Sequence, residues 1–238
     1  IHKSFNDNKV LNGIDLAIYR GETITIMGGS GIGKSVLLKL LLGLIRPDKG
    51  RILFEGKDIA AMDEGELIGI RKKIGMLFQG SALFDSLTVY ENVAYALREH
   101  LNLKEEEIKK RVREKLGLVG LEDVEDKKPA ELSGGMKKRV GLARAIAIEP
   151  EVILYDEPTT GLDPTNSRRI NSLIKELQRV LKVTSIVVTH DIKSAYEVSD
   201  RIALIYEGRI KKAGAVKDFK ITEDEVVAGF LNGTMESA

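Results

Sequence analysis

Short apolar runs alternate with longer amphipathic segments along most of the chain. An apolar run that ends in glycine or polar residues predicts a strand, whereas apolar positions three or four residues apart predict a helix. Because the two patterns alternate, they predict an α/β fold with a mostly parallel sheet that helices cover on both faces. The expected strands are residues 14–19, 24–27, 51–54, 73–78, 152–155, 185–189 and 202–206, and the expected helices are 34–44, 133–148, 167–181 and 192–199.

The stretch from about residue 80 to residue 128 interrupts this alternation, because it is rich in helix formers and charges and has few strand signals. It predicts a helical insertion. The charged run from residue 104 to 115 is most simply a solvated helix face with charge pairs four residues apart. The organisation we expect is one domain over residues 1–218, with a helical subdomain at about 80–148 inserted, followed by a tail over 219–238.

Composition excludes several kinds of partner and site. The 238 residues include 37 Lys and Arg against 36 Asp and Glu, so the net charge of +1 gives no reason to expect a nucleic-acid partner. The absence of cysteine excludes disulfides and thiolate metal sites. The most apolar run, residues 36–45, contains Lys39 and is shorter than the ~20 residues that a membrane span needs. No secretory signal is visible, and the first residue is Ile1 rather than Met, so we expect a trimmed N-terminus.

A glycine-rich segment provides the first candidate site. It fits the spacing G-x-x-x-x-G-K-[ST] and lies between an expected strand and an expected helix. Glycines let several backbone N–H groups turn toward phosphate oxygens, and the helix adds its positive N-terminal end. Lys34 is expected to reach the β- and γ-phosphates, and the Ser35 hydroxyl to ligate Mg²⁺. We call this segment the phosphate loop: Gly28, Gly29, Ser30, Gly31, Ile32, Gly33, Lys34 and Ser35.

The phosphate loop by itself leaves kinases, GTPases, recombinases and transporter ATPases open. An alternative without any ligand, a bare strand–helix turn, is disfavoured because all eight positions and both flanks agree.

Two carboxylates end the expected strand at 152–155. Ligands of parallel sheets bind beyond the carboxyl ends of the strands, so Asp156 should face the Mg²⁺ shell. Glu157 could then polarise a water molecule for attack on the γ-phosphate. The alternative for an acidic pair in this position is a solvated strand end.

A second candidate phosphate site begins the expected helix at 133. Ser133 is a good N-cap, and Gly134 and Gly135 leave the backbone N–H groups uncovered. This helix start lies about 100 residues after the phosphate loop, and one nucleotide site does not need both. The sequence therefore predicts a homodimer in which residues 133–135 contact the γ-phosphate held by the other copy. A simple helix cap is the alternative.

In this order, the phosphate loop, Gln79, Leu132-Ser133-Gly134-Gly135, the Asp156–Glu157 pair and a lone His190 after a strand resemble the ATP-binding cassette (ABC) ATPases. The resemblance covers nearly the whole chain. It implies a P-loop NTPase core with a mainly parallel sheet, an N-terminal antiparallel β subdomain and an inserted α-helical subdomain. ATP and Mg²⁺ are the implied cofactors.

The same resemblance implies individual roles. Phe5 matches the aromatic residue that stacks on adenine, and Gln79 matches a residue that senses Mg²⁺, the attacking water and the membrane partner. Glu157 matches the catalytic glutamate, and His190 the histidine that contacts the γ-phosphate. Asp163 belongs to the segment that touches the opposite copy. Taken alone, Phe5 would be a core residue and His190 a structural histidine.

Two positions depart from the family pattern. Met136 replaces the glutamine that usually ends the serine–glycine segment, which puts a polar contact there in doubt but leaves Ser133 and both glycines. Val36 stands where a hydroxyl residue is common, so one side-chain bond to phosphate is expected to be lost. Val36 stays in the implied nucleotide-binding set because the backbone cradle remains.

Finer resemblance comes from residues 78–89, 91–93 and 97–100 with the segment 132–139, which together are similar to the Mla/Mkl group. Those ATPases energise MCE-type phospholipid transport. The implied partners are an MlaE-type permease and, indirectly, an MCE-type lipid-binding protein, and the implied location is the cytoplasmic face of the inner membrane, peripheral through the permease. The tail residues Phe230 and Leu231 would dock on the partner copy or on a small regulatory subunit, with a frayed end as the alternative.

Other functions stay open at this stage. The chain could be the ATPase of another ABC importer or extruder, or an ABC regulatory subunit outside transport that does not hydrolyse ATP. A small-molecule kinase would have no use for residues 133–135. Chromosome-maintenance or translation ABC proteins would need coiled-coil arms or a second cassette, which 238 residues with one phosphate loop do not supply.

Overall fold

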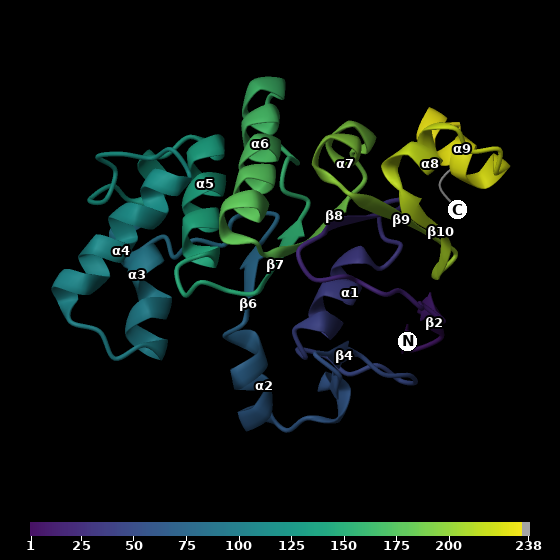
Figure 1. Ribbon diagram of the computed structural model, residues 1–238, viewed down its shortest axis with the longest axis horizontal. Coiled ribbons are helices and arrows are strands. Elements are labelled where there is room, and N and C mark those ends of the chain that lie inside the picture. Colours follow the sequence, from purple (N-terminus) through teal and green to yellow (C-terminus); the bar gives the residue numbers. More distant parts are fainter. Residues whose placement is uncertain (235–238) are drawn as a thin grey trace. The chain divides into compact units, whose positions relative to one another are not determined.

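The computed structural model describes residues 1–234 and forms two compact units (Figure 1). The first unit comprises residues 1–71 and the chain from residue 186 onward, and the second comprises residues 72–185. Within residues 1–234, no helix combines the length and apolarity that crossing a membrane requires.

The first unit is built around a sheet in which β9, β3 and β8 follow one another, with β10 beyond β9. β3 runs parallel to β9, with Met27 opposite Leu204, and β10 is antiparallel to β9. The elements of this unit are β1 (His2–Phe5), β2 (Asn8–Asn12), β3 (Thr23–Met27), α1 (Lys34–Leu41), β4 (Leu53–Phe54), β5 (Lys57–Asp58), a 3₁₀ turn (Ile59–Ala61), α2 (Glu64–Arg71), β8 (Thr184–Thr189, from residue 186), α7 (Ile192–Val198), β9 (Arg201–Tyr206), β10 (Arg209–Ala215), α8 (Val216–Lys220) and α9 (Glu225–Asn232).

The N-terminal region is antiparallel, as the family resemblance implies, and β1 pairs with β2 while β4 pairs with β5. The strand expected at residues 14–19 is wrong, because that segment joins no strand ladder. Its alternation of side chains is nevertheless present, since Ile14 is buried while Asp15 and Tyr19 are exposed. An apolar alternation fixes which side chains point inward, whereas a strand also needs a hydrogen-bonding neighbour.

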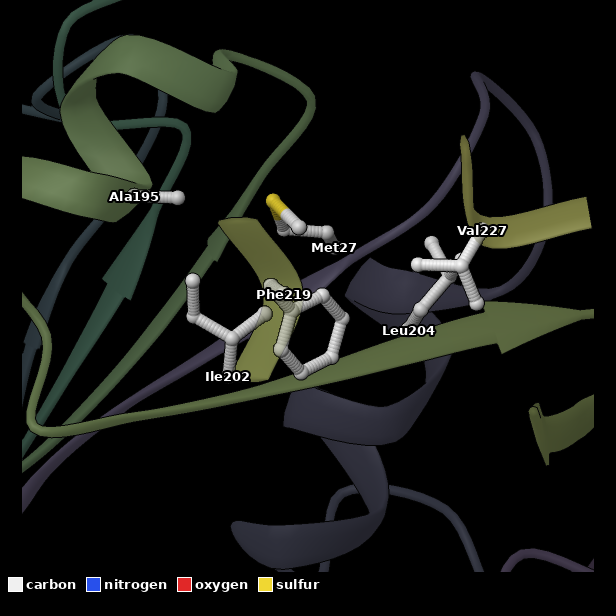
Figure 2. Close-up of a cluster of buried hydrophobic side chains, with 6 residues drawn as sticks. All are labelled: Met27, Ala195, Ile202, Leu204, Phe219 and Val227. Carbon is white, nitrogen blue, oxygen red and sulfur yellow. The ribbon is translucent and has the colours of Figure 1, made fainter. Parts of the chain in front are cut away.

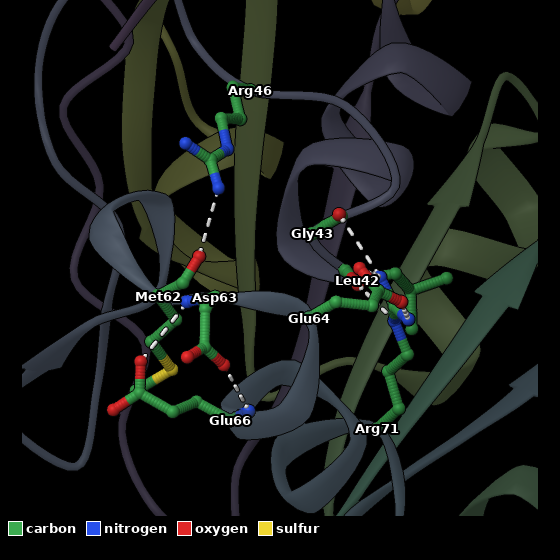
Figure 3. A network of polar contacts seen from close by, with 8 residues as sticks. All are labelled: Leu42, Gly43, Arg46, Met62, Asp63, Glu64, Glu66 and Arg71. Carbon is green, nitrogen blue, oxygen red and sulfur yellow. Dashed lines mark hydrogen bonds and ion pairs between the residues drawn. The ribbon is translucent and has the colours of Figure 1, made fainter.

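The guanidinium group of Arg71 binds the C-terminal end of α1, the helix that follows the phosphate loop. Arg71 donates from Nε to the Leu42 carbonyl at 3.0 Å and from Nη2 to the Gly43 carbonyl at 3.2 Å (Figure 3). Glu64 on α2 pairs with the same guanidinium. Carbonyls at a helix end lack partners within the helix, and a cation there also complements the helix dipole. α1 is therefore anchored at the end opposite the phosphate loop.

The C-terminal helices α8 and α9 belong to the core of the first unit. Phe219 and Val227 are fully buried, and Figure 2 shows them with Met27, Ile202 and Leu204 in one cluster. Two further α9 residues, Phe230 and Leu231, are partly buried against the same cluster. Much of the expected tail therefore packs on its own chain, and its residues 235–238 lie outside the described part of the structure.

The second unit combines a strand pair with a group of helices. β6 (Ile74–Leu77) and β7 (Val152–Asp156) are parallel, and α3, α4 and α5 pack against one another (Figure 1). The helices are α3 (Val89–His100), α4 (Glu105–Leu118), a 3₁₀ turn (Pro129–Glu131), α5 (Gly134–Ala145) and α6 (Pro164–Leu181). The helical character expected after residue 80 is confirmed.

One residue of the charged run on α4 contradicts the expectation of a solvated face. The Lys115 side chain is only 2% exposed, and its Nζ lies 2.9 Å from Glu149 and 3.1 Å from Glu114. The residue sits on the apolar side of α4 with Ile108 and Val112, so helical position rather than residue type decided its burial.

Candidate functional site

The phosphate loop connects β3 to α1 in the first unit. Gly33 is the N-cap of α1, with φ at 102°, and no side chain caps the helix. The first N–H groups of an uncapped helix are available to an anion. An added Cβ at Gly33 would lie 2.6 Å from Val10 Cγ1 on β2, so both the backbone conformation and the close approach of β2 require glycine here.

The lysine of the loop already lies over it. Lys34 is buried, and its Nζ donates to the Gly28 carbonyl at 2.8 Å and the Gly29 carbonyl at 2.9 Å. Ser35 follows it on the exposed side of α1, and Val36 is half-buried. The loop thus holds an ammonium group beside an uncapped helix start, which suits a phosphate group.

Two further predicted residues lie in the first unit. Phe5 ends β1 with 46% of its surface exposed, so the alternative of a core phenylalanine is wrong. Because Val10 of the same β1–β2 hairpin lies against Gly33, the hairpin that carries Phe5 is next to the phosphate loop. His190 is exposed and directly follows β8, the neighbour of β3 in the sheet.

Strand register brings Gln79 and Glu157 together in the second unit. Leu77 of β6 is opposite Tyr155 of β7, and Gln79 and Glu157 each come two residues later. Parallel strands end at one edge of the sheet, so the two residues leave it at the same level. Gln79 is exposed, Asp156 is half-buried and Glu157 is only 8% exposed.

The turn after β7 holds the Glu157 side chain in place. Glu157 has a left-handed backbone with φ at 46°, which is uncommon for a residue other than glycine. The Thr160 hydroxyl donates to Glu157 Oε2 at 3.1 Å, and the Thr160 N–H donates to the Glu157 carbonyl at 3.2 Å. Both contacts fix the orientation of a carboxylate that the sequence marks as the candidate base.

A residue that the sequence reasoning missed connects these two turns. Lys138 on α5 is 4% exposed and donates from Nζ to the Gln79 carbonyl at 2.6 Å and to the Glu157 carbonyl at 3.2 Å. Burial lowers the pKa of Lys138, while the nearby carboxylates of Asp156 and Glu157 act in the opposite direction. Lys138 stands in the polar run Lys137-Lys138-Arg139, so the sequence carried no signal that it is buried.

The serine–glycine segment begins α5 as predicted. Ser133 is the N-cap and is exposed, and its hydroxyl oxygen accepts from the Met136 N–H at 3.3 Å. Gly134 is also exposed, whereas Gly135 is buried. The cap is therefore formed and faces solvent, where an external group can reach it.

The segment that contains Asp163 lies directly against this cap. An added Cβ at Gly135 would be 2.5 Å from Asn166 Oδ1, so α6 approaches α5 closely there. Asp163 caps α6 by accepting from the N–H groups of Thr165 at 2.9 Å and Asn166 at 3.0 Å. The structure thus brings Ser133 and Asp163 into one neighbourhood of the second unit.

Comparison with known proteins identifies the family. A family model described as ABC transporter matches residues 11–160, more than half of the chain. The chain belongs to this family.

Several relatives of this ABC chain are similar over most of its length. A Mycobacterium tuberculosis protein described as the probable ribonucleotide transport ATP-binding protein mkl is 43% identical over 97% of the chain. The chain spans only 64% of that relative's length. The intermembrane phospholipid transport system ATP-binding protein MlaF is 42% identical in Haemophilus influenzae, over 95% of the chain and 86% of the relative, and 42% identical in Escherichia coli K12, over 94% and 83%.

Solved structures confirm the predicted fold class. A dimeric structure of the ATP-binding cassette MJ0796 in a post-hydrolysis state with ADP and Pi has a TM-score of 0.82 and 35% identity, covering 90% of this chain and 95% of that one. The cbiO1 structure from Clostridium perfringens has a TM-score of 0.85 and 36% identity, covering 97% and 92%. The ABC cassette fold and the family resemblance drawn from the motifs are both confirmed.

Proposed function

We propose that this chain is the ATP-binding and ATP-hydrolysing subunit of an ABC transporter, that it works as a homodimer with ATP between the two copies, and that it drives phospholipid transport. The observation that supports this proposal most directly is the exposed Ser133 cap on α5. It is a second helix N-terminus suited to bind phosphate, besides the uncapped one at Gly33. A relative of the same fold is a dimer with ADP and Pi, which supports a shared site.

ATP binding is assigned to the first unit. The backbone N–H groups of residues 28–36 would hold the phosphates, and Lys34 would move from its loop carbonyls to the β- and γ-oxygens. The exposed ring of Phe5 would stack on adenine. The γ-phosphate would also meet Ser133, Gly134 and Gly135 of the other copy, and Asp163 would contact that copy.

The oxygen donors present fit Mg²⁺. Ser35, Asp156 and Gln79 offer a hydroxyl, a carboxylate and an amide oxygen, which are hard ligands of the kind this ion takes. Within residues 1–234 no group of three or more His, Asp or Glu side chains could hold a metal ion. The phosphate oxygens of ATP would therefore have to complete the Mg²⁺ shell in this proposal. When bound, Mg²⁺ would neutralise charge on the β- and γ-phosphates.

Hydrolysis is assigned to Glu157, Gln79 and His190. Glu157, held by Thr160, would accept the proton of a water molecule whose oxygen attacks the γ-phosphorus, while the bond to the β-phosphate oxygen breaks and ADP leaves. Gln79 would orient this water, and His190 would contact the γ-phosphate. ATP would stabilise the closed dimer, and loss of phosphate would allow it to open.

The transport partners follow from the relatives. MlaF of Haemophilus influenzae and of Escherichia coli is described as part of an intermembrane phospholipid transport system, and we infer the same cargo class here. An MlaE-type permease would place the chain at the cytoplasmic face of the inner membrane, with an MCE-type protein as an indirect partner and a small regulatory subunit on the dimer.

The cargo is tested by copurifying the chain with the permease encoded beside it and identifying bound molecules by mass spectrometry. Phospholipid in the complex is the expected result. Ribonucleotide, the cargo in the description of the mycobacterial relative, or another cargo would replace the lipid assignment. Failure to associate with any permease would favour a regulatory role outside transport.

The shared site is tested with two variants. Glu157→Gln should stop ATP turnover and accumulate an ATP-bound dimer on size-exclusion chromatography, because the base is lost while the phosphate contacts remain. Ser133→Arg should stop turnover as well, yet leave ATP binding to the monomer unchanged. A Glu157→Gln variant that still hydrolyses ATP would remove Glu157 as the base, and an active Ser133→Arg variant would refute the shared site.

A further inference from the structure

Helix α5 contacts the loop after β6 through long basic side chains. Lys138 donates to the Gln79 carbonyl at 2.6 Å, and Arg144 donates to the Ser81 carbonyl at 2.8 Å and the Ala82 carbonyl at 2.6 Å. Ser81 and Ala82 both have positive φ, at 63° and 47°. The helix therefore holds an unusual loop conformation by its carbonyl oxygens, which are present whatever the side chains are.

Lys138 extends this hold to the second strand end. Its Nζ also donates to the Glu157 carbonyl at 3.2 Å, so one ammonium group joins the turns that follow β6 and β7. Since Leu77 and Tyr155 are paired, the two accepting residues are at the same level of the sheet. A lysine suits this position because it has three donors and no acceptor.

Burial of the Lys138 ammonium group costs hydration free energy unless polar partners compensate for it. The side chain lies on α5 among residues that are fully buried, including Val140 and Leu142, and only 4% of Lys138 is exposed. A charged group loses its hydration in such a place and is retained only with good partners. The partners are the two carbonyls together with the negative charges of Asp156 and Glu157.

We propose that Lys138 is a positioning residue for ATP hydrolysis. It fixes the backbone at Gln79 and Glu157 so that both side chains point toward the same water molecule. The inference rests on the roles of Gln79 and Glu157 proposed above. Lys138 would touch neither nucleotide nor water and would act through Gln79 and Glu157, which do.

Lys138 lies on the helix that also carries the proposed contact with the other copy. Ser133 caps this helix five residues earlier, a rise of about 7.5 Å along the axis.

The test compares three variants of the full chain in steady-state ATP hydrolysis. Lys138→Met keeps the length and apolar stem but removes every donor, and it should lower kcat at least tenfold while the KM for ATP changes less than twofold. Lys138→Arg restores donors and charge and should recover most of kcat. The matched control is Lys115→Met, which removes another buried lysine, one that pairs with Glu149 instead.

Thermal unfolding of the same samples separates positioning from folding. Both methionine variants should lose stability, but only Lys138→Met should lose kcat per folded molecule, which supports the inference. An unchanged kcat in Lys138→Met, an equal loss in Lys115→Met, or an arginine variant as slow as the methionine variant would overturn it. If Lys138→Met does not fold, Lys138→Leu, which also has no donor, takes its place with the same expectation for kcat.

The outcome for Glu157→Gln keeps this inference distinct from the proposed function. An inactive Glu157→Gln protein with a fully active Lys138→Met protein refutes the role of Lys138 alone. An active Glu157→Gln protein refutes the catalytic assignment itself, whatever Lys138 does.

Discussion

Replacing Val227 by alanine should destabilise the isolated chain, because Val227 anchors α9 in the core of the first unit. The side chain is fully buried against the cluster that contains Phe219 and Leu204 (Figure 2). The sequence alone suggested instead that this tail docks on a partner copy or a regulatory subunit. The two interpretations differ in whether a single protomer already gains stability from α9.

The magnitude follows from what the substitution removes. Two buried methyl groups at ~0.8 kcal/mol each give ~1.6 kcal/mol, and an unfilled cavity adds up to ~1 kcal/mol. The higher helix propensity of alanine offsets ~0.5 kcal/mol of this loss. The net loss at Val227 is therefore about 1–2 kcal/mol. For a chain of this size each kcal/mol lowers Tm by about 2–4 °C, so we expect a decrease of about 2–8 °C.

The assay is thermal unfolding of the nucleotide-free protein at several protein concentrations. Val226→Ala is the control, because it makes the same change one residue earlier on α9, where the side chain is only half-buried. The Val227→Ala decrease should exceed that of the control and should not depend on concentration. A decrease below 1 °C, or one that appears only at concentrations where the chain dimerises, would refute packing of α9 on its own core.

Two further predictions concern α6, the first its contact with α5 and the second its N-cap. Gly135→Ala would place a Cβ 2.5 Å from Asn166 Oδ1 and should cost about 1–3 kcal/mol by overpacking. In a double-mutant cycle measured by urea unfolding, Asn166→Ala should restore part of that loss, and purely additive effects would argue against the clash. The second prediction is the pH dependence of stability at Asp163, whose pKa lies below its ordinary value of 3.8. Hydrogen bonds from the backbone N–H and the side-chain amide of Asn166, and from the Thr165 N–H, lower it. The ionised Asp163 therefore stabilises α6 above that pH, and its contribution is lost as the pH falls through the lowered pKa. The stability difference between wild type and Asp163→Asn should accordingly shrink on acidification below 3.8, and a difference that grows there would contradict the cap.

The two candidate phosphate sites were predictable as local structures, because a glycine-rich loop and a helix cap are each formed by consecutive residues. The helix starts at Gly33 and Ser133 could therefore be assigned from spacing and residue type. The strands β3, β7 and β9 were equally clear because each is a continuous apolar run. The short strands β4 and β5 and the helix α2 carry weaker patterns, and most of these were not anticipated.

Residues whose role depends on distant contacts were not predictable. Lys138 and Lys115 look like ordinary surface lysines in the sequence, yet both are buried with specific acceptors. The segment at residues 14–19 has the alternation of a strand without a partner strand to pair with. In each case the deciding factor is a neighbour supplied by another part of the chain.

The sequence by itself determined the family, the order of its motifs and the class of chemistry, because these depend on short runs of residues and the backbone they form. Tertiary structure alone decided that Lys138 joins Gln79 to Glu157, that Gly135 must be small beside Asn166, and that α9 covers its own sheet. Such contacts join residues distant in sequence, and local propensity carries no information about which distant groups meet once a chain is packed.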